Sequence, residues 1–256
     1  KGKTLYTLSP DFSMYDYYAS SYEAKVEKYP THVDGSFDIQ DFIEKGKEKK
    51  ADLILFSNPN NPTGHCLTEE EVLQIVKAFD GPVVIDEAYM EFSTHTMIPY
   101  VEKYPNLFVT RTLSKAYGLA GLRVGFLIGN EKAMAEYRKI RVPYLLSTVS
   151  QRIATIVIEH AEDFQMEIQS IIQYREEMFD KLCMLRYMTF YPSEANFLYG
   201  QCEDKPLLME CFKKANIVIR DYAGSDFFRI TIGNREENEK VLQVLQMYAR
   251  ERMKHA

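Results

Sequence analysis

Residues 109–125 read VTRTLSKAYGLAGLRVG, and the architecture that we expect for the whole chain follows from this segment. An apolar run at residues 107–109 predicts one strand, and a second run at residues 124–128 predicts another beyond a glycine-containing loop. The loop carries one lysine, Lys115, among small and apolar residues with no acidic neighbour. A solvated surface lysine is the ordinary interpretation. A desolvated lysine has a lowered pKa and can attack a carbonyl carbon, and we expect this behaviour here.

Hydroxyl groups and a guanidinium flank this lysine. Thr112 and Ser114 precede Lys115, and Arg123 follows it by eight residues. Such donors suit a phosphate dianion, because charge-assisted hydrogen bonds can converge on its oxygens. Pyridoxal phosphate requires an amine that can attack its aldehyde and, beside it, hydrogen-bond donors for its phosphate. This segment offers both.

Short apolar segments alternate with amphipathic helices over the first half of the chain, which is typical of an α/β fold with a mainly parallel sheet flanked by helices. Strands are predicted at residues 4–8, 25–29, 52–56, 82–85 and 107–109. One helix is predicted at residues 14–22, a second after the capping residue Asp38, and a third after Thr68, which forms a capping box with Glu71.

Polar segments follow three of the predicted strands, at residues 58–64, 86–89 and 112–115. Ligands of parallel α/β sheets bind at the carboxyl ends of the strands. We therefore expect the three segments to meet at one edge of the sheet and to form the site together.

The pattern changes in the second half of the chain. A long helical stretch is predicted from about residue 148 to residue 185, and a last helix from Glu236. Shorter strands are predicted between them, at residues 188–191, 196–199, 217–219 and 227–232. We expect a large domain at residues 1–147, and linking helices with a smaller α+β domain at residues 148–256.

Taken together, these motifs resemble the fold-type I pyridoxal-phosphate-dependent aminotransferases of class I/II, and most of all their histidinol-phosphate aminotransferase branch. The resemblance implies that Lys115 forms a Schiff base with the cofactor and acts as the catalytic base. It implies that Asn61, in the string SNPNNPTG at residues 57–64, bonds the cofactor's ring oxygen, as does Tyr89. Asp86, in VVIDEAY at residues 83–89, would hold a proton on the ring nitrogen, although a helix cap or a strand-end ion pair is the ordinary alternative.

The resemblance assigns the remaining contacts as well. Phe12, in SPDFSMY at residues 9–15, would stack on the cofactor ring, unless it is a core side chain. Thr112, Ser114 and Arg123 would bind its phosphate. Arg229, in FRITIG at residues 228–233, would bind the substrate α-carboxylate through a bidentate contact, and Arg220 a substrate phosphate.

The implied activity is transamination between an amino acid or amino-alcohol phosphate and a 2-oxo acid, by a homodimer. A decarboxylase of threonine phosphate shares the same motifs and is one alternative. Relatives carry an amino-terminal segment, with part of the phosphate site, that does not precede Lys1. The third alternative is therefore a truncated, inactive domain, and we expect this chain to hold cofactor weakly.

Composition excludes other classes of function. The net charge is −6 without a basic stripe, which argues against nucleic acid as a partner. No apolar run approaches the ~20 residues of a membrane helix. The 4 cysteines have neither zinc-site nor disulfide-framework spacing, which indicates a cytoplasmic protein with reduced thiols, and the 5 scattered histidines indicate no metal site.

Overall fold

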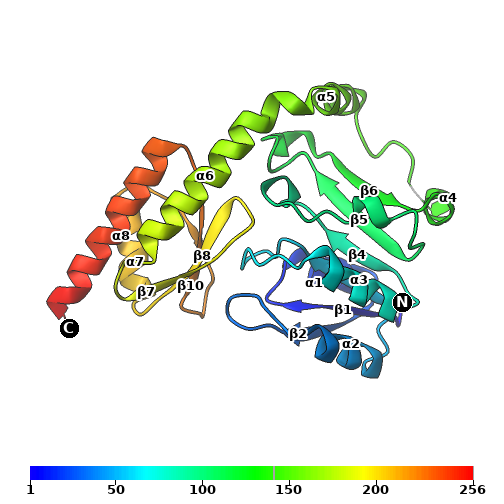
Figure 1. Ribbon diagram of the computed structural model, residues 1–256, viewed down its shortest axis with the longest axis horizontal. Helices are drawn as coiled ribbons and strands as arrows, with labels where there is room; N and C mark the ends of the chain where they lie inside the picture. Colours follow the sequence, from blue (N-terminus) through cyan, green and yellow to red (C-terminus); the bar gives the residue numbers. More distant parts are fainter. Residues whose placement is uncertain (141, 256) are drawn as a thin grey trace.

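The computed structural model describes residues 1–140 and 142–255, and it contains two sheets, each packed against helices (Figure 1). Arg141 and Ala256, the latter at the end of the expected second domain, lie outside the described residues. The α-helices of the described chain are α1 (Met14–Ser21), α2 (Ile39–Glu48), α3 (Glu69–Ala78), α4 (Glu131–Ile140), α5 (Thr148–Glu159), α6 (Gln165–Leu182), α7 (Lys205–Lys214) and α8 (Arg235–His255).

The larger sheet has the strand order β2-β1-β3-β4-β5-β6. Its strands are β1 (Thr4–Ser9), β2 (Lys25–Pro30), β3 (Leu53–Ser57), β4 (Val83–Asp86), β5 (Leu107–Thr112) and β6 (Gly125–Gly129). All pairs are parallel except that between β5 and β6, which is antiparallel. The mainly parallel sheet that the sequence predicts is thus confirmed. The loop that carries the lysine is therefore a connection between neighbouring antiparallel strands and needs no crossover helix.

The local signals at the helix starts are also confirmed. Asp38 accepts hydrogen bonds from the backbone N–H groups of Gln40 and Asp41 at the start of α2. Thr68 and Glu71 form a complete capping box at the start of α3. Both helices turn apolar faces, including Phe42 and Val72, toward the core of the large sheet. This packing fixes the sheet edge at which the polar loops emerge.

The smaller sheet is antiparallel, in the order β7-β8-β10-β9, and lies beside the first part of the molecule (Figure 1). Its strands are β7 (Met188–Tyr191), β8 (Phe197–Cys202), β9 (Arg220–Asp221) and β10 (Phe227–Thr231). A separate core joins it to α6, α7 and α8, with Phe228, Ile230 and Leu245 among the buried side chains. The small α+β unit predicted from the sequence is therefore present.

The helical stretch predicted from about residue 148 to residue 185 is confirmed as two α-helices. The backbone at His160 leaves the helical conformation after α5, and a short 3-10 turn precedes α6. One local prediction in this half is wrong. Residues 217–219 do not form the predicted strand. Backbone pairing begins only at Arg220, and the Val218 side chain is 97% exposed. Within the described residues, no helix is both long and apolar enough to cross a membrane.

Candidate active site

The predicted site residues on three neighbouring strands come to one edge of the large sheet. Ser57 at the end of β3 lies opposite Asp86 on β4, and Asp86 lies opposite Thr110 on β5. The strands are parallel, so the loops that follow them emerge on the same side. This arrangement brings Asn61, Tyr89 and the lysine loop into one region of the molecule.

Asp86 is fixed by two hydroxyl groups. The Tyr15 hydroxyl donates to one carboxylate oxygen at 2.7 Å, and the Thr110 hydroxyl donates to the other at 2.9 Å. Burial, with the negative charge of Asp86, raises the pKa of Tyr15 well above its usual value, so Tyr15 remains a donor. Neither partner was expected from the sequence. Tyr15 follows Phe12 by three residues, at the start of the helix predicted just after the first strand, and this position was the available signal.

A second carboxylate lies close to Asp86. Asp11 accepts hydrogen bonds from the hydroxyl and the backbone N–H of Ser57, and from the backbone N–H of Phe12. Removal from water raises the pKa of Asp11 to about 7, while these hydrogen bonds oppose the shift and the charge of Asp86 adds to it. Asp11 was not expected at the site from the sequence.

Asn61 and Arg229 contact each other across the two units. Arg229, on β10 of the small sheet, donates to the side-chain oxygen of Asn61 at 2.6 Å. Its guanidinium lies 4.4 Å from the centre of the Phe197 ring, and its Nε atom is buried without a partner in the described structure. The expected alternation on this strand is confirmed, because Phe228 and Ile230 are buried while Arg229 faces the other side. The guanidinium thus retains an unused donor at the site.

Lys115 lies next to Tyr89, but it is exposed. Its ammonium group is 5.3 Å from the centre of the buried Tyr89 ring, which itself packs edge-on against Phe197. The expectation of a desolvated lysine is therefore wrong for the chain described here. The loop is anchored on both sides of the lysine, by buried Leu113 before it and buried Val124 after it, so Lys115 projects into solvent from a fixed base.

The three residues expected to bind phosphate are only partly assembled. The hydroxyl groups of Thr112 and Ser114 are 2.9 Å apart, and the Ser114 N–H donates to the Thr112 hydroxyl. Arg123 is exposed, adopts a left-handed backbone conformation with φ of 56°, and donates to the carbonyl of Ala120. The Thr112 hydroxyl also approaches the carbonyl of Val124, the residue that follows Arg123.

The two remaining predicted site residues, Phe12 and Arg220, have exposed side chains. Phe12 is 40% exposed and packs edge-on against Tyr15, so it is not a core side chain. Arg220 is exposed on β9, directly opposite Arg229 in the sheet register. Burial raises the pKa of Tyr222, and the charges of Arg229 and Arg220 oppose that shift, which puts both arginines close to this tyrosine.

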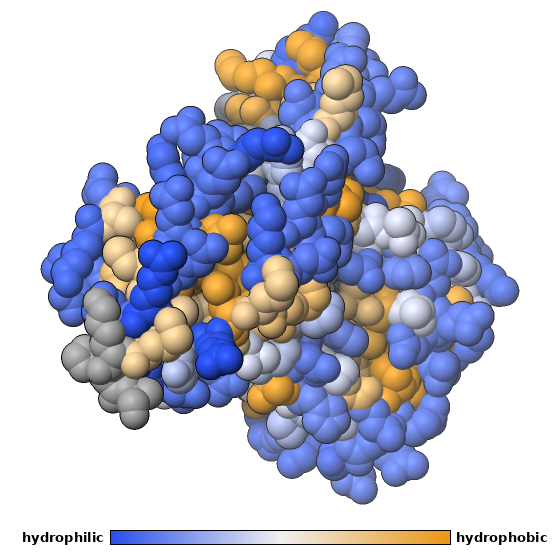
Figure 2. Space-filling model, turned by 60° about the vertical axis from the view of Figure 1, so that its left-hand side comes forward, coloured by the Kyte–Doolittle hydropathy of each residue, from blue (hydrophilic) through white to orange (hydrophobic). Residues whose placement is uncertain are grey.

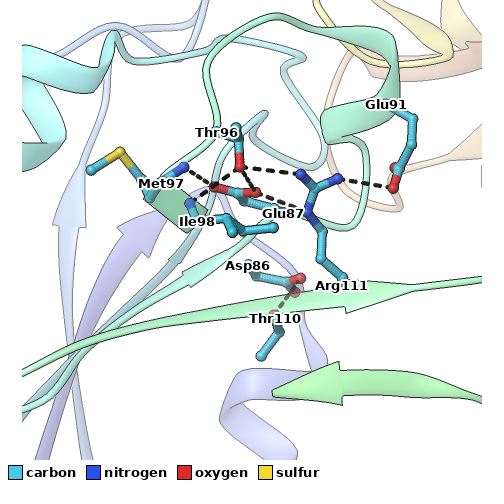
Figure 3. A network of polar contacts seen from close by, with 8 residues as sticks. All are labelled: Asp86, Glu87, Glu91, Thr96, Met97, Ile98, Thr110 and Arg111. Carbon is cyan, nitrogen blue, oxygen red and sulfur yellow. Dashed lines mark hydrogen bonds and ion pairs between the residues drawn. The ribbon is translucent and has the colours of Figure 1, made fainter. Parts of the chain in front are cut away.

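A buried ionic network supports the loop that carries Tyr89 (Figure 3). The Arg111 guanidinium lies 2.9 Å from both Glu87 and Glu91, which flank that tyrosine in the sequence. Glu87 also accepts hydrogen bonds from the Thr96 hydroxyl and the Met97 N–H. Burial raises the pKa of both glutamates, and the positive charge of Arg111 opposes the shift. The network joins Arg111 on β5 to the segment that follows Asp86. It therefore holds this segment in place from the side of β5 that faces away from the Asp86 carboxylate.

Comparison with known proteins decides the family. A family model described as "Aminotransferase class I and II" matches residues 1–245. The chain belongs to this family. Among its relatives, histidinol-phosphate aminotransferase from Clostridium kluyveri is 36% identical over 248 residues, which are 96% of this chain and 71% of that protein. The enzyme of the same name from Pyrococcus furiosus is 36% identical over 253 residues, covering 98% of this chain and 72% of that protein.

Solved structures of an aminotransferase and of a decarboxylase share the fold. Histidinol-phosphate aminotransferase from Sinorhizobium meliloti, in complex with pyridoxal-5'-phosphate, superposes with a TM-score of 0.87 at 22% identity, covering 98% of this chain and 71% of that one. L-threonine-O-3-phosphate decarboxylase from Porphyromonas gingivalis superposes with a TM-score of 0.83 at 23% identity, covering 97% of this chain and 78% of that one. The predicted fold and family are both confirmed.

The donor set of this aminotransferase chain fits pyridoxal phosphate. An ionisable acid fixed by two hydroxyls, Asp86, can face a ring nitrogen. The paired hydroxyls of Thr112 and Ser114 can face a phosphate, and the amine of Lys115 lies on the loop directly after them. Arg229 is partly exposed and uses one N–H toward Asn61, so other N–H groups of its guanidinium can bind an anionic substrate group.

Proposed function

We propose that this chain is a pyridoxal-phosphate-dependent aminotransferase of the histidinol-phosphate type, which moves an amino group between an amino acid or amino phosphate and a 2-oxo acid. The observation that carries the proposal is the convergence of Asp86, Asn61 and the Lys115 loop at one sheet edge, with Asp86 held by two hydroxyls. A carboxylate fixed in this way is preorganised to face a positive charge, so it does not have to reorient during the reaction.

Each group has a role in the proposed reaction. Bound pyridoxal phosphate supplies an aldehyde and an electron-withdrawing ring. Asp86 keeps a proton on the ring nitrogen, because its ionised carboxylate accepts that proton's hydrogen bond. Lys115 uses its free amine to take the proton from the substrate α-carbon. The hydroxyls of Thr112 and Ser114 bind the phosphate, and Arg229 orients the substrate carboxylate.

The relatives favour transamination over decarboxylation. The proteins at 36% identity are named histidinol-phosphate aminotransferases, whereas the decarboxylase resembles the chain at 23% identity and therefore in fold alone. The reaction itself can be decided by product analysis. With histidinol phosphate and 2-oxoglutarate we expect glutamate, and with O-phosphothreonine we expect no release of carbon dioxide.

We also infer a homodimer in the cytoplasm. The four cysteines are free, as in proteins of a reducing compartment. Apolar residues are exposed on and around α5: Ile140, Val142, Tyr144, Leu145 and Val149. Figure 2 shows hydrophobic surface at the upper end of the molecule, where α5 lies in Figure 1. Large exposed apolar patches commonly mark subunit contacts.

The test of the proposed function is covalent labelling of Lys115. The chain is incubated with pyridoxal phosphate and reduced with borohydride, and the modified peptide is identified by mass spectrometry. We expect the pyridoxyl group on Lys115 in the native sequence and no label at this site in Lys115→Ala. Because Lys115 is exposed, the free energy of unfolding should change by less than about 0.5 kcal/mol.

A matched control is Lys103→Ala, since the Lys103 ammonium is also exposed and lies 5.5 Å from a tyrosine ring, that of Tyr104. This variant should be labelled at Lys115 like the native chain. Equal labelling of many surface lysines, with no preference for Lys115, would contradict the proposed function.

A further inference from the structure

The strongest unassigned feature of the site is the carboxylate of Asp11. It accepts three hydrogen bonds, two from Ser57 and one from the backbone N–H of Phe12. An ionised carboxylate is an acceptor only, and so it can satisfy all three donors at once. A proton on either oxygen would leave at least one of these donors facing an O–H group.

The Ser57 hydroxyl connects Asp11 to Asn61 through hydrogen bonds. The Ser57 hydroxyl accepts a hydrogen bond from the backbone N–H of Asn61 at 2.9 Å. A hydroxyl carries a single proton, and the Ser57 proton is directed to Asp11. The lone pairs of the hydroxyl are therefore turned toward Asn61 for as long as Asp11 remains an acceptor.

Asn61 in turn holds the arginine that the proposed function assigns to the substrate carboxylate. Arg229 donates to the Asn61 side-chain oxygen at 2.6 Å. Within the described chain no carboxylate forms an ion pair with Arg229, and its Nε has no partner. The amide of Asn61 is thus the hydrogen-bonding group that sets the position of the guanidinium.

We propose that Asp11 is a positioning residue for the carboxylate-binding arginine: its ionised form orients the Ser57 hydroxyl, which holds Asn61 and thereby Arg229. The proposal deepens the proposed function and rests on it, because it takes Arg229 as the group that binds the substrate carboxylate. Asp11 itself touches neither substrate nor cofactor in this role.

The consequence is a dependence of carboxylate affinity on pH. The titratable groups that interact with Asp11 are Asp86 at the end of β4 and the Tyr15 hydroxyl on α1, and the Tyr15 pKa is raised by its burial beside both carboxylates. Asp11 itself titrates at about 7, mainly because it is removed from water. About nine-tenths of the molecules therefore carry the ionised form at pH 8 and about one-tenth at pH 6, so the apparent affinity should fall about tenfold between them.

The test measures binding of 2-oxoglutarate by calorimetry at pH 8 and pH 6, with the chain free and loaded with pyridoxal phosphate. We expect the native chain to lose about tenfold in affinity at the lower pH. Asp11→Asn cannot change its charge, so its affinity should be the same at both values. Ser57→Ala lacks the relaying hydroxyl and should bind at both values as weakly as the native chain does at pH 6.

Asp52→Asn is the matched control. Asp52 also accepts a backbone N–H, that of Thr4, but it lies at the start of β3 and so at the opposite end of the sheet. This variant should keep the native pH dependence, and loss of the dependence here would overturn the proposal. So would a native-like pH dependence in either Asp11→Asn or Ser57→Ala. If one of these two variants does not fold, the other still decides.

Arg229→Met separates the two proposals. We expect it to lose affinity at both pH values. If Arg229→Met binds as the native chain does, the assignment of the carboxylate to Arg229 fails, and the role of Asp11 fails with it. If Arg229→Met loses binding while Asp11→Asn keeps the native pH dependence, only the role of Asp11 is overturned.

Discussion

Asp11 carries its charge at a cost to stability. Its pKa rises from the ordinary value of 3.8 to about 7 on folding, because burial disfavours the ionised carboxylate more than its hydrogen bonds favour it. The folded state therefore binds this proton more tightly than the unfolded state does. Linkage requires that the resulting stabilisation is complete below the unfolded pKa and is lost as the pH rises through about 7.

We expect this loss to appear as a difference between two chains. Between pH 4 and pH 8, the free energy of unfolding of the native chain should fall relative to that of Asp11→Asn by on the order of 2–4 kcal/mol, since each pKa unit corresponds to about 1.4 kcal/mol. Urea denaturation at several pH values measures both. Parallel pH profiles for the two chains would show that Asp11 titrates normally in the folded state.

Sequence strings could identify some of these residues but not their partners. Asn61, Asp86 and Lys115 each lie in a motif that can be read from adjacent residues, and all three lie at the predicted sheet edge. The bond from Tyr15 to Asp86 joins residues 71 positions apart, and the bond from Ser57 to Asp11 joins residues 46 apart. Such contacts depend on strand order, and a single sequence does not determine which strands become neighbours.

At the level of secondary structure, β5 carries Arg111 between two residues that serve the site. Thr110 bonds Asp86, Thr112 bonds Ser114, and Arg111 points to the opposite side, into the network with Glu87 and Glu91 (Figure 3). Alternation along the strand thus divides it into a face for the ligand and a face for support. One strand, β5, therefore positions both the residues that face the ligand and the arginine that supports them.

Removal of Arg111 should destabilise the fold strongly. In Arg111→Met the buried Glu87 and the partly buried Glu91 lose their positive partner, and breaking a buried ion pair on one side typically costs about 3–5 kcal/mol. Chemical denaturation measures the change. Arg152→Met, at an exposed position on α5, is the control and should change stability by less than about 0.5 kcal/mol. A loss of under about 1 kcal/mol in Arg111→Met would contradict a stabilising role for the network.

The features that the sequence did not predict lack a strong local signal. The break at His160 contains neither proline nor glycine, and the helical pattern continues on both sides of it. Residues 217–219 are β-branched, which favours a strand, yet no neighbouring strand pairs with them in the described sheet. By contrast, the capping residues before α2 and α3 act within one helical turn, and the sequence predicted both.

Across the whole molecule, α6 connects the two units (Figure 1). The buried guanidinium of Arg175 donates to the carbonyl of Phe92 in the first unit and to the carbonyl of Ala195 in the second. A boundary between residues 147 and 148 remains a prediction. The contacts of Arg175 nevertheless indicate that the two hydrophobic cores should unfold together.

We expect the two units to melt in one cooperative transition in the native chain. In Arg175→Met we expect them to melt in two separate transitions. Each of the two carbonyls that loses its donor costs about 1–3 kcal/mol, and the loss falls on the contact between the units. Differential scanning calorimetry can resolve one peak from two. Arg186→Met, at an exposed position after α6, should keep the single peak, and a single unshifted peak in Arg175→Met would argue against coupling through this side chain.

The hydrogen bond from Arg229 to Asn61 also has a consequence for molecular selectivity. A compound that approaches the guanidinium must compete with an amide oxygen that already occupies one of its donors. A neutral amide or alcohol offers no stronger acceptor than Asn61, so it gains little by displacing it. A carboxylate gains, because it adds the attraction between opposite charges and can accept two parallel N–H bonds from the guanidinium. The resting contact therefore screens out uncharged analogues of the substrate before any chemistry begins.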